Sequence, residues 1–447
     1  MAQAEPIIIL GGGVAGLAAG GAARRRGRPF LILERAGRTG GNCVTFAHGP
    51  FRFDSGAHRF HEHDREATLQ VRRLLSDGLK RVDVPSQVYA RGRFVTFPFK
   101  AAELAAAFGW RFLLRVAGEM AAARLGRKNR GGDFAARKTR AYGPTLAGSY
   151  LLNYSQKLWG LPAGRLSDEI AGNRLRGLNG WGLVRDAFAA AGNPATHLEG
   201  AFAYPDGGIG AISDSLAAEC GRENVRTGAE VRRVFHENGR IRAVQVNGGE
   251  VLACAAVLSS IPLDRFLRLL DPAPPAAVLA AAAFAYRRLA LVALFLDRET
   301  VSHAATLYFP EPRFPFTRIC EPRNRWRGMA PEGRTSLVAE IPFSTGSGIE
   351  SLAEERLVET VRSTLAGIGL ITGNEVLGGC VRRLDDAYPV LDRGVEDRRR
   401  EVFSYLGRFA NLRCIGRNGT FRYLHIHHLL PDAARAVGEL LAGEGES

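Results

Sequence analysis

A glycine-rich turn near the N-terminus limits what this chain can fold into. Residues 6–10 form an apolar run typical of a central parallel strand, and residues 11–16 continue as Gly-Gly-Gly-Val-Ala-Gly, a G-x-G-x-x-G pattern. Residues 17–26, rich in Ala, Gly and Arg, predict a helix. In such a unit Gly11 permits the tight turn, Gly13 lets the backbone approach a pyrophosphate, and Gly16 lets helix and strand pack closely. The pattern predicts a dinucleotide site at the start of the helix.

An acidic residue and a second pair of glycines follow the next strand. Residues 29–33 are apolar, and Glu34 ends this strand 18 residues after Gly16. A carboxylate there accepts hydrogen bonds from a ribose diol and disfavours a 2′-phosphate. Residues 34–41 then read E-x-x-x-R-x-G-G, with Arg38 before the glycine pair. This continuation resembles the signature of the FAD-binding amine oxidase and protoporphyrinogen oxidase-like superfamily, and the resemblance implies FAD as the cofactor.

The resemblance extends along nearly the whole chain. Residues 53–60, Phe-Asp-Ser-Gly-Ala-His-Arg-Phe, stand where this superfamily places a loop facing the flavin ring, and the version with His is similar to UDP-galactopyranose mutases and their bacterial relatives. Further matches occur in the same order at residues 97–99, 154–160, 167–174, 204–210, 387–390 and 416–423.

The resemblance implies two sets of site residues. The cofactor-binding set is Gly11, Gly13, Ala15, Gly16, Glu34, Arg35, Arg38, Gly40, Gly41, Asn42, Val231, Gly416, Arg417 and Tyr423. The set expected at the reacting centre is His58, Arg59, Arg174, Arg318, Tyr388 and Tyr423. Val231 is expected at the adenine end, although an ordinary core valine explains that position equally well.

The expected fold class is α/β, with a Rossmann-type FAD-binding domain and an inserted α+β substrate domain. The FAD-binding domain is expected to be discontinuous, over residues 1–85, 200–265 and 380–447, and the substrate domain to comprise residues 86–199 and 266–379, with the active site between them. Among the elements we expect a single helix over 101–125 and a hairpin of strands 225–235 and 241–246 around Asn238-Gly239. Near the C-terminus we expect a strand over 412–415, a turn at Gly416-Arg417 and a helix over 429–441.

Two classes of reaction stay open. A mutase-like enzyme acts on a nucleotide-activated sugar through the flavin N5 and needs arginines for the diphosphate. Candidates in the inserts are Arg174, Arg287, Arg288 and Arg318, with Tyr388 and Tyr423 available for a phosphate oxygen or the sugar. The alternative is an FAD-dependent oxidase or dehydrogenase of the protoporphyrinogen oxidase or amine oxidase type that oxidises a small metabolite. Many amine oxidases of the superfamily place a lysine near the flavin, and this chain has none after Lys157, which argues against standard amine oxidation.

Charge and composition limit the classes of molecule that this chain is expected to bind. The chain carries 60 Lys and Arg against 45 Asp and Glu, a net charge of +15. The arginines are spread along the chain without a zinc-finger spacing, an RNP signature or a basic tail, so an anionic small molecule, expected to be a nucleotide sugar, is favoured over nucleic acid. No apolar stretch is long enough to span a membrane and no leader pattern is visible, so we expect a cytoplasmic protein. A homo-oligomer is compatible with the sequence.

Histidines and cysteines give no metal signature. The six cysteines are scattered, which excludes a Cys-x-x-Cys site and a disulfide framework. Relatives usually carry an Asn/Asp-rich stretch after the tyrosine at 423, whereas this chain has His425, His427 and His428. No acid or Cys lies at useful spacing nearby, so no metal is expected. One histidine is expected to face the flavin or substrate and the others the surface; which one does so is left open.

Overall fold

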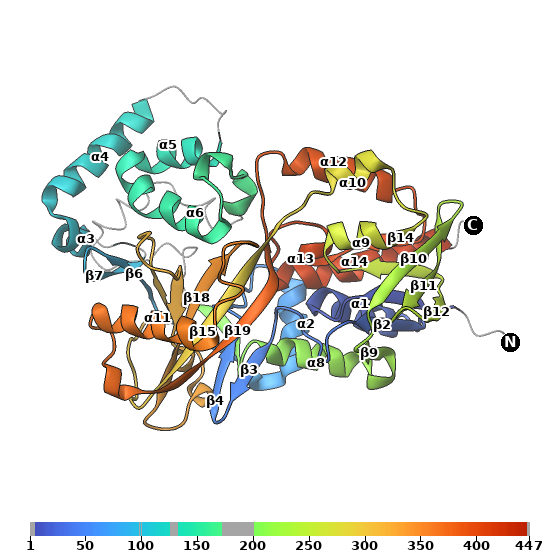
Figure 1. The fold of residues 1–447 in the computed structure, drawn as a ribbon, viewed down its shortest axis with the longest axis horizontal. Helices are drawn as coiled ribbons and strands as arrows, with labels where there is room; N and C mark the ends of the chain where they lie inside the picture. Colours follow the sequence, from blue (N-terminus) through green and yellow to red (C-terminus); the bar gives the residue numbers. More distant parts are fainter. Residues whose placement is uncertain (1–4, 98, 100, 126–132, 172–200, 445–447) are drawn as a thin grey trace.

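The glycine-rich turn belongs to a five-stranded parallel sheet in strand order β20-β13-β1-β2-β9. The computed structural model describes residues 5–97, 99, 101–125, 133–171 and 201–444 (Figure 1). The strands of this sheet are β1 (Ile7–Leu10), β2 (Phe30–Glu34), β9 (Val225–Thr227), β13 (Ala256–Ser259) and β20 (Leu412–Cys414). Because they are parallel, the turns after β1, β2, β13 and β20 all lie at one edge of the sheet.

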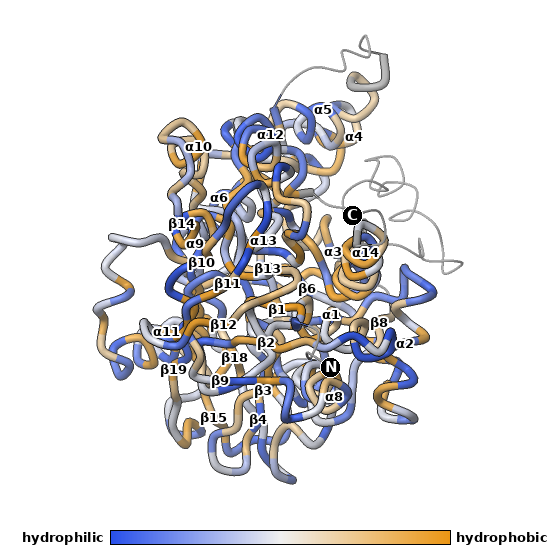
Figure 2. The backbone as a smooth tube through the Cα atoms, turned by 90° about the vertical axis from the view of Figure 1, so that its right-hand side faces the viewer, coloured by the Kyte–Doolittle hydropathy of each residue, from blue (hydrophilic) through white to orange (hydrophobic). Residues whose placement is uncertain are grey.

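Each face of this sheet is covered by a different layer. Along β1, Ile7 and Ile9 pack among helices, whereas Ile8 and Leu10 point to the opposite core. The helical layer consists of α1 (Val14–Arg25), α2 (Arg65–Leu75), α8 (Gly210–Cys220) and α14 (Ile426–Glu444). The other layer is a four-stranded sheet with α9 (Leu263–Leu269); its strands are β10 (Val231–Glu237), β11 (Arg240–Val246), β12 (Glu250–Ala253) and β14 (Leu270–Asp271). Figure 2 shows the apolar stretches in the inner strands and much of the polar chain, including α2, on the outside.

A seven-stranded mixed sheet stands beside these layers (Figure 1). Its strands are β6 (Ser86–Ala90), β7 (Arg93–Phe97), β15 (Tyr286–Leu296), β16 (Thr306–Tyr308), β17 (Arg318–Cys320), β18 (Thr335–Phe343) and β19 (Val376–Pro389). Its outer face packs against α11 (Glu354–Gly367). Its inner face joins the core that also covers the parallel sheet. β19 pairs with β15 from Val376 to Pro389, so it extends across residue 380 as one strand.

Helices on the upper left of Figure 1 cover the β6–β7 end of this sheet. They are α3 (Ala101–Phe108), α4 (Trp110–Leu125), α5 (Phe134–Leu146) and α6 (Asn153–Trp159). The remaining elements are α10 (Ala276–Ala281), α12 (Val395–Leu406), α13 (Gly416–Gly419) and the strand pairs β3 (Thr45–His48) with β4 (Phe51–Asp54) and β5 (Leu79–Val82) with β8 (Phe202–Pro205). None of the helices in the described ranges combines the length and the apolar character that crossing a bilayer requires.

Three expected elements differ in the structure. The helix expected over 101–125 is two helices, because Gly109 has a φ of +82° that an α-helix does not accommodate. The strand expected over 225–235 is divided at Gly228 (φ +66°) into β9 and β10, which belong to different sheets. The turn expected at Gly416-Arg417 is the short helix α13. The hairpin turn at Asn238-Gly239 forms as expected between β10 and β11, with φ values of +49° and +71°.

Candidate active site

The glycine-rich turn is held in close contact with the second glycine pair. Gly11 has a φ of +99°, and a Cβ on Gly16 would lie 1.9 Å from the Gly11 carbonyl oxygen, so no side chain fits there. A Cβ on Gly41 would lie 3.2 Å from the Cα of Gly13. The two glycine segments therefore lie backbone against backbone at the carboxyl edge of the sheet.

The last strand of the sheet brings its turn to the same place. Gly416 has a φ of +79°, and a Cβ there would lie 2.9 Å from the Cβ of Ala15. The N-cap of α1, Gly13, provides no side-chain hydrogen bond, and the first turn holds no acidic residue. The first N–H groups of this helix are therefore left for an external anion such as a pyrophosphate.

Glu34 lies at the end of β2 with one backbone partner on each carboxylate oxygen. Oε2 accepts from the Gly12 N–H at 2.7 Å, and Oε1 accepts from the Ala36 N–H at 2.8 Å. Each oxygen keeps a lone pair for a ribose hydroxyl. Val231 starts β10 two residues after Ala229, whose N–H donates to the Glu34 carbonyl at 2.9 Å. The structure thus brings Val231 close to the acid.

Arg35, Arg38 and Asn42 line the segment that carries the second glycine pair. Nη1 of Arg38 donates to the Gly41 carbonyl at 3.3 Å. Arg35 is half-exposed, with Nη2 4.0 Å from a carboxylate oxygen of Asp386. Nδ2 of Asn42 donates to the carbonyl of Asp386 at 2.9 Å. The end of β19 therefore fixes this segment from the side of the seven-stranded sheet.

Arginine and aromatic side chains from four distant segments meet next to this edge. We call Trp159, Arg318, Tyr388, Arg417 and Tyr423 the Arg–Tyr cluster. The Trp159 ring lies 5.9 Å from that of Tyr388 and 5.3 Å from that of Tyr423, centroid to centroid. The Arg417 guanidinium lies 5.8 Å and 5.3 Å from the same two tyrosine rings. Three of the residues expected at the reacting centre or the cofactor are thus neighbours: Tyr388, Arg417 and Tyr423.

Arg318 joins the cluster through a hydrogen bond from its Nη2 to the Tyr388 hydroxyl at 3.1 Å. Burial raises the pKa of Tyr388 to about 12 even though Arg318 lowers it, so this phenol stays protonated at neutral pH. Because the hydroxyl oxygen accepts from Arg318, its hydrogen is available to a ligand. In the described part of the chain, Nη1 of Arg318 makes no hydrogen bond. The pair can offer two donors to one anionic group.

Arg417 uses its donors within the protein. Nε and Nη2 donate to the Leu424 carbonyl at 2.9 and 2.6 Å, and Nη1 donates to the Ala387 carbonyl at 3.3 Å. These bonds join the chain after α13 to the end of β19. Arg417 therefore contributes positive charge above the tyrosine rings, while its hydrogen bonds maintain the backbone.

His58 is held as a neutral imidazole on the loop after β4. Its Nε2 lies 3.1 Å from the Ser55 hydroxyl, whose own hydrogen goes to the Asn42 carbonyl at 2.8 Å. His58 Nε2 must then be the donor, which leaves Nδ1 as an acceptor. Burial, followed by the charges of Arg417 and Arg318, lowers the pKa of His58 to about 3. His58 therefore offers an acceptor and carries no charge at neutral pH.

Other arginines expected near the substrate lie in different surroundings. Arg59 is buried, donates to the Ser86 and Thr306 hydroxyls at 2.9 and 3.2 Å, and lies over the Phe202 ring. Arg288 pairs with Asp385. Arg287 donates to the carbonyls of Lys157, Leu158 and Pro342. Arg174 lies outside the described residues. Among the expected arginines that are described, Arg318 has the environment best suited to an anion.

Two residues of this region, Glu340 and Trp159, are not among those predicted from the sequence. Glu340 is fully buried and accepts from Arg318 Nε at 2.7 Å and from the Ala57 N–H at 2.5 Å. A single acid within the apolar strand 336–341 was the signal that could have found it. Trp159 stands within the segment 154–160 that resembles the mutases, and only the fold shows that its ring contacts the two tyrosines.

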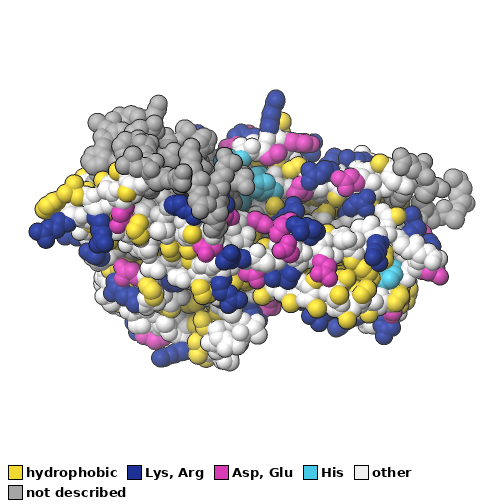
Figure 3. Space-filling model, turned by 90° about the horizontal axis from the view of Figure 1, so that it is seen from above, with side chains coloured by type: hydrophobic (Ala, Val, Ile, Leu, Met, Phe, Trp, Pro, Cys, Tyr) yellow, Lys and Arg dark blue, Asp and Glu magenta, His cyan; other side chains and the backbone are white. Residues whose placement is uncertain are grey.

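Five histidines from two distant segments gather at the start of α14. They are His61, His63, His425, His427 and His428, with ring centroids of neighbouring members 4.0 to 6.2 Å apart. His427 is buried, and Figure 3 shows histidine side chains grouped on one face among acidic and basic ones. Within the described ranges, no three His, Cys, Asp or Glu side chains are arranged to hold a metal ion. The Tyr423 ring lies 5.0 Å from that of His425, so this group borders the Arg–Tyr cluster.

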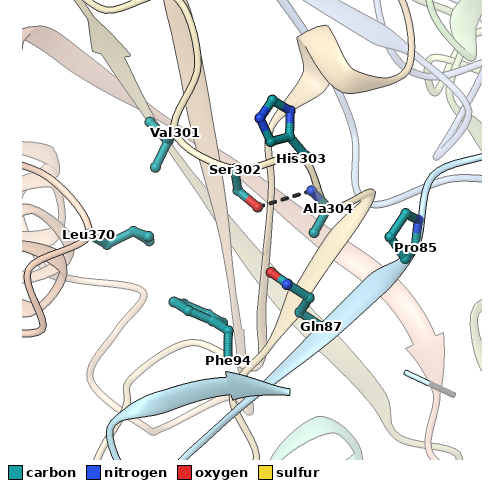
Figure 4. A pocket seen from close by; sticks show the side chains of 8 residues that line it. All are labelled: Pro85, Gln87, Phe94, Val301, Ser302, His303, Ala304 and Leu370. Atoms are coloured by element: carbon teal, nitrogen blue, oxygen red, sulfur yellow. Dashed lines mark hydrogen bonds between the residues drawn. The ribbon is translucent and has the colours of Figure 1, made fainter. Parts of the chain in front are cut away.

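A cavity of about 280 Å³ lies elsewhere, next to the outer core of the seven-stranded sheet (Figure 4). Gln87 and Phe94 line it from β6 and β7, and Pro85, residues 301–304 and Leu370 complete it. Ser302 Oγ accepts from the Ala304 N–H at 3.0 Å within this lining. None of the expected site residues contributes to the cavity.

Comparison with known proteins gives one family and a common fold. A family model described as flavin containing amine oxidoreductase matches residues 14–391. A reduced UDP-galactopyranose mutase is 20% identical, covers 98% of this chain and 94% of its own, and has a TM-score of 0.86. A provisionally assigned protoporphyrinogen oxidase from Exiguobacterium sp. 255-15 is 17% identical, covers 100% of each chain, and has a TM-score of 0.78. At these identities the structural matches establish the fold.

One curated relative matches a shorter region. A zeta-carotene-forming phytoene desaturase from Myxococcus xanthus is 39% identical over 82 residues. This match spans 18% of the present chain and 16% of the desaturase.

Proposed function

The chain belongs to the flavin containing amine oxidoreductase family, and from this premise we propose that it is an FAD-dependent enzyme that isomerises a nucleotide-activated sugar. The observation that carries the proposal is the Arg–Tyr cluster, in which Arg318 donates to the Tyr388 hydroxyl beside aromatic rings and each of the two side chains keeps a further donor. A diphosphate sugar requires such an arrangement, because its phosphates need charge-assisted hydrogen bonds and its sugar packs on aromatic faces.

FAD is the cofactor, and the residues present fit it. The close approach of Gly416 to Ala15 leaves no room for a side chain at residue 416, and the N–H groups at the start of α1 suit a pyrophosphate. Asn418, two residues after Gly416, donates to the Asp386 carbonyl through Nδ2 at 3.1 Å, while its buried Oδ1 has no partner in the described part of the chain. When bound, FAD supplies hydride transfer and a nucleophilic ring nitrogen.

In the proposed reaction the chain's own residues bind and orient the substrate. Arg318 Nη1 and the Tyr388 hydroxyl bind phosphate oxygens, and the Trp159 and Tyr423 rings pack against the sugar. Since burial holds the pKa of Tyr388 at about 12, this phenol donates a hydrogen bond and stays neutral. His58, neutral with Nδ1 free, can accept a hydrogen bond and bring no second positive charge.

The only lysine close to this region is fully engaged, which disfavours an amine-oxidising site among the described residues. Lys157 Nζ donates to the carbonyls of Phe309, Glu311 and Phe316 at 2.7, 3.0 and 2.8 Å. No lysine follows it in the sequence. A lysine-assisted oxidation of amines is therefore not supported by these residues.

The test is a comparison of the reduced and oxidised holoenzyme. The purified protein is incubated with UDP-, GDP- and dTDP-sugars, with and without dithionite, and products are separated by chromatography and identified by NMR. An isomer of unchanged mass, formed only with the reduced enzyme, is the expected result. If no sugar is isomerised and a small metabolite bleaches the flavin anaerobically, the enzyme is an oxidase or dehydrogenase and the proposal is wrong.

A matched pair of variants ties the result to the cluster. Arg318→Lys replaces the planar guanidinium, which can donate to a phosphate and to the Tyr388 hydroxyl at the same time. We expect turnover of the accepted sugar to fall at least tenfold. Arg313→Lys changes an exposed arginine paired with Glu311 and should leave turnover unchanged. If both variants were equally active, Arg318 would have no role in binding the substrate.

A further inference from the structure

A buried carboxylate lies between the Arg–Tyr cluster and the loop that carries His58. Glu340 stands in the middle of β18, where its neighbours Ala339 and Ile341 pack on the outer face of the seven-stranded sheet. Side chains alternate along a strand, so Glu340 points to the inner face, as Val338 does. The Glu340 side chain is completely excluded from solvent.

Glu340 has one partner on each side of the site. Its Oε2 accepts from Arg318 Nε at 2.7 Å, and its Oε1 accepts from the Ala57 N–H at 2.5 Å. Burial by itself lowers the pKa of Arg318, but the Glu340 charge outweighs this effect and the pKa lies above the ordinary value of an arginine. The same carboxylate also approaches Gly56, where a Cβ would lie 3.3 Å from Oε1.

We infer that Glu340 is a positioning residue that couples the orientation of Arg318 to the backbone of the loop at residues 54–60. Taking a carboxylate out of water costs several kcal/mol unless charged and N–H donors compensate for it. Here one compensating donor belongs to β17 and the other to the loop after β4, so the carboxylate keeps its bonds only when both are in place. This inference rests on the proposed function, which assigns a nucleotide sugar to Arg318 and the flavin to the loop.

A second buried glutamate provides the control. Glu321 follows β17 and is also excluded from solvent. It accepts from the Thr335 hydroxyl at 2.7 Å and from the Ser302 N–H at 2.8 Å, beside the cavity of Figure 4. Glu321→Gln therefore reproduces the loss of a buried charge next to the same sheet, and Glu321 has no hydrogen bond to Arg318 or Ala57 in the described part of the chain.

The experiment measures the flavin absorption spectrum of the purified holoenzyme and the Kd of UDP for wild type, Glu340→Gln, Glu321→Gln and Arg318→Lys. We expect Glu340→Gln to shift the flavin bands and to weaken UDP about tenfold, as loss of a hydrogen bond to a charged group predicts. Arg318→Lys should also weaken UDP and shift the bands in the same direction, because it removes one of the two donors that hold the carboxylate. Glu321→Gln should do neither.

The outcomes separate this inference from the proposed function. If Glu340→Gln matches Glu321→Gln in both measurements, the coupling role is wrong while the proposed function stands. If wild type fails to bind UDP, the proposed substrate class is wrong, and the flavin bands alone decide the role of Glu340. Should Glu340→Gln not fold, Glu340→Asp, which keeps the charge but is one methylene shorter, is expected to shift the bands, and unshifted bands would overturn the inference.

Discussion

Among single residues, the arginines near the site differ in where their donors go. Arg287 and Arg417 bind backbone carbonyls with nearly every nitrogen and so maintain the fold. Arg318 binds Glu340 and Tyr388 through Nε and Nη2 and, within the described ranges, leaves Nη1 without a partner. In a chain with a net charge of +15, the free donor rather than the charge identifies the anion-binding candidate.

Tyr388→Phe tests the second donor of that site. The substitution removes the hydroxyl that accepts from Arg318 and keeps the ring that packs against Trp159. We expect activity on the accepted substrate to fall by about ten- to a hundredfold, because a hydrogen bond to a charged group is lost, and the thermal midpoint to fall only by what the Arg318–Tyr388 hydrogen bond contributes. Steady-state kinetics and thermal denaturation measure the two effects. Unchanged kcat and KM would exclude the hydroxyl from substrate binding.

Among the elements, α6 is joined to the seven-stranded sheet by Lys157. Its ammonium group donates to three carbonyls of the segment 309–316, and burial lowers the pKa of this lysine to about 8. Trp159 of the Arg–Tyr cluster stands two residues further along the same helix. The position of that ring therefore depends on the attachment of α6.

Lys157→Met should destabilise the protein by about 1–3 kcal/mol, because three buried carbonyls lose their donor. Urea denaturation of the variant measures the change. Lys80→Met, at an exposed lysine near Asp206, is the control and should stay within about 0.5 kcal/mol of wild type. A Lys157→Met midpoint equal to that of the control would show that the three bonds contribute no net stability.

On the scale of the whole molecule, one core extends from the four-stranded sheet to the seven-stranded sheet, and the site lies along it. His58 is partly buried at this junction as a neutral group. Its pKa of about 3 is below that of an unfolded histidine, so the unfolded chain binds its proton first as the pH falls. The contribution of neutral His58 to the free energy of unfolding is fully present above about pH 6.5 and is lost toward acid pH. Burial also lowers the pKa of His428, with the same sign.

We therefore expect the unfolding free energy to fall by up to about 1.4 kcal/mol per pH unit below about pH 6.5 on account of His58 alone. Chemical denaturation between pH 7.5 and pH 4.5 gives this slope for wild type. The His58→Gln variant has no titrating group at that position. The slope of its unfolding free energy against pH should be smaller, because unfolding takes up one proton fewer. Identical slopes for both proteins would mean that His58 is protonated as easily in the folded chain.

The local elements followed from the sequence because their causes are local. The apolar strand β1, the glycines of the turn, Glu34 at the end of β2 and the Asn238-Gly239 hairpin each depend on neighbouring residues and are found as expected. The single helix over 101–125 was wrong for a local reason as well, since the conformation of Gly109 outweighed the helical pattern on both sides. The family resemblance, carried by residues 34–41, was confirmed by the family match.

By itself the sequence determined the parallel sheet with its dinucleotide turn, the flavin family and the absence of a lysine in its later half. Only the tertiary structure decided that Arg318 lies in the Arg–Tyr cluster with Nη1 unbonded in the described part of the chain. It also decided that Glu340 joins β18 to the loop before His58, and that His61 and His63 meet His425 to His428. The reason is physical. Short-range patterns express backbone sterics and burial, whereas the partners of a buried charge are brought together by the fold from separate segments, as Ala57 is brought to Glu340 across 283 residues of sequence.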